Sequence, residues 1–74
     1  MDKRSLSIAG HRTSIALEPE FWAALEAMAA EKSQTMAALI REIDENRQTT
    51  NLSSATRVAV LRWYQQRAGN NVAP

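Results

Sequence analysis

The segment His11–Leu17 constrains the fold more than any other part of this sequence. Its residues alternate between two faces, with Thr13, Ile15 and Leu17 on one face and basic, polar or small residues on the other. This period-two alternation, with β-branched residues on one side, predicts a strand that is buried on one face. The strand should end before Pro19, which cannot donate a ladder hydrogen bond but suits the first turn of a helix.

A single strand leaves its backbone N–H and C=O groups unpaired. The simplest solution is to pair it with the same strand of a second copy, and helices must then cover the inner face of this ribbon. The chain has 74 residues, no cysteine and one histidine. Because a chain this short has a marginal core and no disulfide or evident metal site, oligomerisation is the remaining source of stability. We therefore predict an obligate homodimer without metal or cofactor.

The residues before this strand form a weaker pattern. Lys3–Ala9 also alternates, and Gly10 interrupts the alternation. A glycine inside a strand pattern indicates a bulge or a bend. We predict an extended N-terminal arm over residues 1–10 that pairs along only part of its length. No apolar segment is long enough to span a membrane or to act as a secretory signal, so the expected location is the cytoplasm.

Three helices should follow the strand. The first is expected from Pro19 to Lys32, and the second from Met36 to Arg47 with Thr35 as its N-cap. The third should begin at a cap formed by Asn51 or Ser53 and end near Ala68, with Gly69 as its stop and a frayed tail beyond it. This organisation divides a single domain into an arm (1–10), a core (11–48) and a linker, helix and tail (49–74).

Apolar residues at helical spacing define the expected core. Phe21, Met28 and Met36 extend the helical stripes that face it. The predicted dimer core consists of Thr13, Ile15, Leu17, Trp22, Leu25, Leu39, Ile40 and Ile43. The third helix carries apolar residues around more than one face, so it should pack on two sides; these residues are Val58, Val60, Leu61, Trp63 and Tyr64.

Charge is distributed unevenly although the formal net charge is only +1. The first 14 residues hold Lys3, Arg4 and Arg12 against a single acidic residue, and no acidic residue follows Gln48. The segment between them is acidic. Because a field follows local charge, the strand end and the tail should be positive.

The order strand, helix, short capped turn, helix resembles the ribbon-helix-helix family of Arc- and Met-repressor-like DNA-binding proteins. The resemblance is carried by the segments G-H-R-T-S-I-A-L-E-P-E-F-W, L-E-A-M-A-A-E-K and T-M-A-A-L-I-R-E-I, and the later segment N-L-S-S-A-T-R-V-A-V-L is similar to what a bacterial branch of the family carries. It covers residues 11–47 and extends to the third helix. The fold class that it implies is mostly α with one β-strand, in which two chains form an antiparallel ribbon.

The resemblance also implies a mechanism, in which the ribbon lies in the DNA major groove. The outward residues Arg12, Ser14 and Ala16 would then contact bases, although Ala16 stands where the family often carries a long polar residue. Phosphates would be bound at the start of the second helix, where free N–H groups point outward. The expected phosphate contacts are Thr35, Met36, Lys3, Arg4 and His11.

Two functions therefore remain open at this stage. The first is a homodimeric, sequence-specific transcriptional regulator that binds double-stranded DNA, as a repressor or autoregulator. The second is a protein-interaction module or antitoxin-like protein with weak or no DNA readout, whose third helix binds a protein partner. An enzyme is not expected, because one histidine with no cysteine and no glycine-rich phosphate loop offers few catalytic combinations. The aromatic residues Trp22, Trp63 and Tyr64 could instead stack on single strands, but their apolar neighbours favour a core or interface role.

Overall fold

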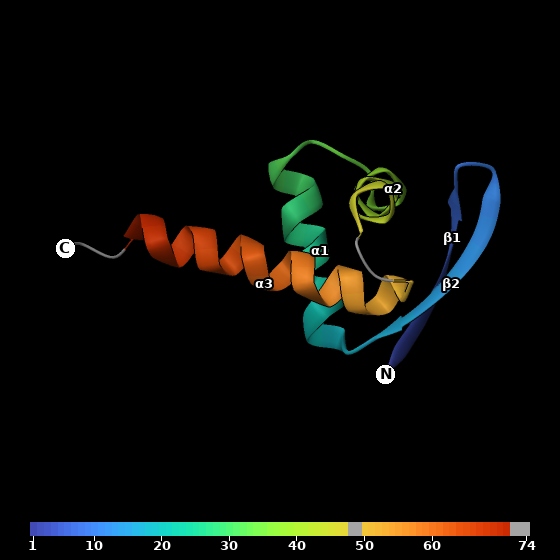
Figure 1. Ribbon diagram of the computed structural model, residues 1–74, viewed down its shortest axis with the longest axis horizontal. Coiled ribbons are helices and arrows are strands. Elements are labelled where there is room, and N and C mark those ends of the chain that lie inside the picture. The colour runs from blue at the N-terminus through green and yellow to red at the C-terminus, as the bar shows by residue number, and fades with distance from the viewer. Residues whose placement is uncertain (48–49, 72–74) are drawn as a thin grey trace.

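The computed structural model describes residues 1–47 and 50–71, with side chains as far as residue 68. Two strands, β1 (Asp2–Ile8) and β2 (His11–Leu17), precede three helices, which are α1 (Pro19–Glu31), α2 (Met36–Asn46) and α3 (Leu52–Asn71). Figure 1 shows the strands together at one end of the molecule, with α3 running away from them toward the other end. One face of the two strands is therefore covered by none of the helices in the described part of the chain.

The arm before Gly10 is a full strand. It pairs with β2 in antiparallel register over its whole length, from Asp2 opposite Leu17 to Ile8 opposite His11. Ala9 and Gly10 have positive φ angles of 51° and 82°, so they form a two-residue hairpin turn of the kind that requires φ > 0 at both central positions. Of the two alternatives predicted at Gly10, the chain makes a bend and not a bulge. The predicted partial pairing was wrong. The strand β2 finds one partner within its own chain.

Local signals set the starts of the first two helices. Pro19 occupies the first turn of α1, and Glu20 adds negative charge there. Thr35 caps α2, because its Oγ1 accepts a hydrogen bond from the Ala38 N–H at 3.1 Å. Both helices end one residue earlier than predicted. The predicted cap and both predicted helix starts are confirmed.

The core lies between the inner face of the hairpin and the three helices. Six of the eight predicted core residues are buried, namely Ile15, Leu17, Trp22, Leu25, Leu39 and Ile40. Thr13 and Ile43 are only partly buried in the single chain, and their place in a dimer core stays a prediction. Thr13 lies near the open turn end of the hairpin, and Ile43 lines a groove of about 430 Å³ beside α3.

The third helix begins as predicted but ends later. Asn51 is its cap, and the Asn51 Oδ1 accepts a hydrogen bond from the Ser54 N–H at 3.1 Å. The helix continues through Gly69 to Asn71, so Gly69 is not its stop. A glycine ends a helix only where the chain turns into the left-handed region, and it can also remain helical at a modest cost. Fraying was predicted for residues 70–74, but residues 70 and 71 belong to the helix, and residues 72–74 lie outside the described residues.

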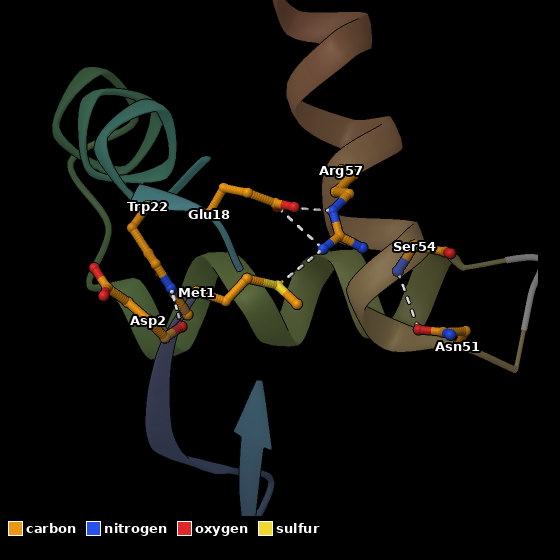
Figure 2. Close-up of polar contacts among 7 residues, drawn as sticks. All are labelled: Met1, Asp2, Glu18, Trp22, Asn51, Ser54 and Arg57. Atoms are coloured by element: carbon orange, nitrogen blue, oxygen red, sulfur yellow. Dashed lines mark hydrogen bonds and ion pairs between the residues drawn. The ribbon is translucent and has the colours of Figure 1, made fainter. Parts of the chain in front are cut away.

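Ion pairs fix α3 across α1. Arg57 donates two hydrogen bonds to Glu18 Oε1, at 3.0 and 3.2 Å, and Arg67 lies 2.8 Å from Glu31 (Figure 2 shows the first pair). On the side toward the core, Val60 is buried and Trp63 is partly buried. On the other side Val58, Leu61 and Tyr64 remain 43%, 55% and 52% exposed. We predicted that this helix packs on two sides. Within the single chain, only one of its sides is packed against other elements.

Candidate nucleic-acid interface

The outer face of the hairpin is polar and basic. Side chains of alternating residues on both strands point away from the helices, because those between them enter the core. The register makes three rows on this face, which place Lys3 opposite Ala16, Ser5 opposite Ser14 and Ser7 opposite Arg12. All are exposed except Ala16, which is partly buried.

The three residues predicted for base contact thus share one face, and β1 adds three more. Lys3 was predicted to contact phosphate, and no role was predicted for Ser5 or Ser7. The alternation of Lys3–Ala9 before the turn-forming Gly10 is the sequence signal that points to these residues, because it is typical of the first strand of a hairpin. Ala16 has no long polar side chain of its own. Lys3 lies directly across from it on β1, so a long cationic side chain stands beside Ala16.

Arg4 points in the other direction. Its guanidinium donates a hydrogen bond to Glu26 Oε1 at 3.2 Å and lies 4.6 Å from the centre of the Trp22 ring. Both partners belong to α1, so the Arg4 guanidinium lies on the inner side of the hairpin and is already paired there. We therefore leave Arg4 out of the proposed interface. His11 is exposed and begins β2 directly after the turn.

The start of α2 lies beside the turn end of the hairpin. One cleft is lined by three residues of that end and by six residues just before and along α2. These are Ser7, Ile8 and Ala9 of the hairpin, and Gln34, Ala37, Ala38, Arg41, Glu42 and Glu45. Because the Thr35 hydroxyl satisfies the Ala38 N–H, the N–H groups of Met36 and Ala37 are left without an acceptor inside the helix. An anion beside the turn would thus meet free N–H groups and the positive end of the helix dipole.

Two carboxylates line this cleft, and each is paired with neighbouring side chains. Glu42 accepts hydrogen bonds from the Gln34 amide at 2.9 Å and from Lys32 at 3.2 Å. These contacts lower the pKa of the Glu42 carboxyl, the Gln34 bond more than the Lys32 bond. Glu45 lies 3.5 Å from Arg41. The acidic side chains are therefore engaged with cations or donors of the same chain.

We also searched the described residues for a metal site and for a membrane-spanning helix. Among the described residues, no three His, Asp or Glu side chains come close enough to hold a metal ion. Within the same residues, none of the helices combines the length and the apolar character that crossing a bilayer requires.

Comparison with known families agrees with this geometry. A family model described as a ribbon-helix-helix domain matches residues 1–64, which include β1 and most of α3. No curated protein and no solved structure matches the chain. Domains of this kind generally dimerise and bind DNA, and they are typically not enzymes. The match covers far more than half of the sequence, and the chain therefore belongs to the ribbon-helix-helix domain family.

Proposed function

We propose that this protein is a homodimeric, sequence-specific DNA-binding regulator of transcription, acting as a repressor or autoregulator. The observation that carries this proposal is the outer face of the hairpin. It exposes two cations and three serines on a surface whose opposite side is anchored in the core. We assign it no catalytic residues.

The dimensions of the hairpin suit the major groove. Strand axes about 4.8 Å apart make a narrow ribbon, and a groove about 12 Å wide admits a two-stranded ribbon with its side chains. Arg12 can hold the O6 and N7 atoms of a guanine with two hydrogen bonds, and a serine can bond to several bases. The Met36 and Ala37 N–H groups, beside the turn, would then bind a backbone phosphate.

The predicted pairing of β2 with the β2 of a second copy stays a prediction, because the structure holds a single chain. β1 pairs with one edge of β2, so this strand does not depend on a second copy for all of its hydrogen bonds. The remaining support is the exposed apolar side of α3, where Val58, Leu61 and Tyr64 line a second groove with Phe21 of α1. Burial of these side chains against a second copy would remove their apolar area from water.

Leu61→Glu should convert a dimer into a monomer, because it places a charge in this apolar surface. Light scattering across a dilution series should give twice the chain mass for the parent and a single chain mass for this variant. Gln66→Glu, which adds the same charge at an exposed position on α3, should leave the dimer intact. A folded parent of single chain mass would contradict the homodimer.

Arg12→Ala should separate base reading from phosphate binding. Arg12 is exposed and outside the core, so thermal stability should hardly change. Binding to the preferred duplex should weaken by about 1–3 kcal/mol for a lost guanine contact, while binding to random duplex falls much less. Both duplexes would be titrated at several salt concentrations. Equal weakening would make Arg12 a phosphate contact.

If the parent bound neither duplex, the regulator proposal would fail and the second function would replace it. The exposed apolar side of α3 is the observation that favours an interaction module or antitoxin-like protein.

Thr35→Ala should weaken both duplexes together, since a phosphate contact carries no sequence information. It also removes the cap of α2, which should lower the free energy of unfolding by about 1 kcal/mol. Thr35→Ser keeps the hydroxyl and is the matched control for both effects. A loss confined to the preferred duplex would contradict this assignment.

A further inference from the structure

We propose that the two strands of the outer face have different tasks on DNA, with β2 reading bases and β1 binding backbone phosphates through Lys3, Ser5 and Ser7. This inference rests on the proposed function, because it assumes that the outer face of the hairpin meets the major groove. It keeps the predicted phosphate role of Lys3 and gives the same role to Ser5 and Ser7, for which none was predicted.

β1 lies on the side of the sheet where α2 begins. Of the helices, α2 packs mainly against β1, whereas α3 packs against β2 (Figure 1). Ser7 and Ala9 line the same cleft as Ala37, whose N–H is one of the two groups that we propose to bind a phosphate. β1 therefore lies between that phosphate site and the strand proposed to read bases. This position corresponds to the border of the groove and not to its centre.

The dimensions of a sheet agree with this position. Neighbouring strand axes lie about 4.8 Å apart. β2 pairs with β1 along one edge, and its other edge pairs with no strand of the described residues. If the β2 strands of two chains pair through these edges, as the family resemblance implies, each β1 axis lies about 7 Å from the middle of the ribbon. Half the width of the major groove is about 6 Å, so β1 would lie over the phosphates that border it.

The outward side chains of β1 suit phosphate. Lys3 is exposed and makes no hydrogen bond or ion pair with the part of the chain that the structure describes, so its ammonium is available. Lysine binds phosphate as a point charge, and serine hydroxyls donate to phosphate oxygens. The Oγ atoms of Ser5 and Ser14 are 3.1 Å apart, so one hydroxyl donates to the other and the accepting one keeps its hydrogen for the DNA. None of the outward residues of the hairpin is acidic, so an anion meets no repulsion there.

The salt dependence of binding tests the role of Lys3. Lys3→Ala should weaken the preferred and the random duplex by the same factor, because a phosphate contact carries no sequence information. The slope of log K against log salt should become less steep by about 0.9 for each Lys3 that is lost, or about 1.8 for a dimer. Lys3→Arg keeps the charge and is the matched control. Arg62→Ala removes an exposed cation from α3 and should leave the slope unchanged.

Neutral phosphates would locate the contacts. Preferred duplexes that carry a methylphosphonate at one position, which removes the charge of one phosphate, would be titrated with the parent and with each variant. The phosphate that Lys3 contacts should weaken the parent when neutralised and should have no further effect on Lys3→Ala. Ser5→Ala and Ser7→Ala should each become insensitive at another position. The position for Ser7 should lie nearer to the phosphate bound at the start of α2, because Ser7 lines the cleft there.

Thermal unfolding would first show that the variants fold, since all three side chains are exposed and outside the core. If Lys3→Ala weakened only the preferred duplex, Lys3 would read a base, and the inference would fail while the regulator proposal stood. Unchanged affinity and salt slope for Lys3→Ala would mean that β1 does not contact DNA, with the same consequence. If the parent bound neither duplex, the regulator proposal would fail, and this inference would fail with it.

Discussion

Replacing Trp22 with alanine should lower the free energy of unfolding by about 3–5 kcal/mol, the largest loss expected from any single substitution in this chain. Trp22 is 1% exposed and is one of the largest fully buried side chains of the core. Its Nε1–H also donates a hydrogen bond to the Asp2 carbonyl oxygen at 2.9 Å, as Figure 2 shows. The ring therefore fastens the start of β1 to α1, and its loss removes both packing and this bond.

Chemical denaturation at fixed protein concentration would measure the change, and amide hydrogen exchange would show whether β1 opens first. Trp63→Ala is the matched control, because the Trp63 ring is only partly buried on α3 and has Arg67 above it at 4.7 Å. Its loss should be clearly smaller. Equal losses for the two tryptophans would contradict this arrangement of the core.

Leu39→Ala should cost about 2–5 kcal/mol, while Ile43→Ala, one turn further along α2, should cost clearly less. Leu39 is 1% exposed and Ile43 is only partly buried in the single chain, where it lines the groove beside α3. The two residues lie on the same helix and have side chains of the same size. The difference between their losses of unfolding free energy therefore reports the difference in burial. Unfolding by denaturant at several protein concentrations would measure both variants.

An equal loss for the two variants, with an unfolding midpoint that depends on protein concentration, would mean that a second copy covers Ile43. The dimer surface would then include the groove between α2 and α3 instead of the exposed α3 residues alone.

Local chemistry explains why much of the fold could be predicted. The alternation around Ile15 fixes which face of β2 enters the core, since a strand has a side-chain period of two. Pro19 and Thr35 mark helix starts because one lacks an N–H and the other supplies an acceptor to a free N–H. The outward direction of Arg12 and Ser14 follows from the same parity.

The candidate interface was only half predicted. The sequence placed Arg12 and Ser14 on one face, but Ser5 and Ser7 were missed, because the alternation before Gly10 was interpreted as an arm. Arg4 and Lys3 are neighbours in sequence, so they point to opposite faces of a strand. This difference separates their roles only because β1 pairs with β2 and has an inner and an outer face. Glu26 and Trp22 then account for the inward position of Arg4.

The sequence by itself determined the elements whose signals lie within a few residues, namely β2, the starts of α1 and α2, and most of the buried face. Only the tertiary structure decided which strand pairs with β2, because strand pairing depends on contacts between segments and on whether Ala9 and Gly10 adopt positive φ together. It also decided the exposure of Ile43 and of the outer side of α3, because burial depends on what the rest of the chain brings against a helix face.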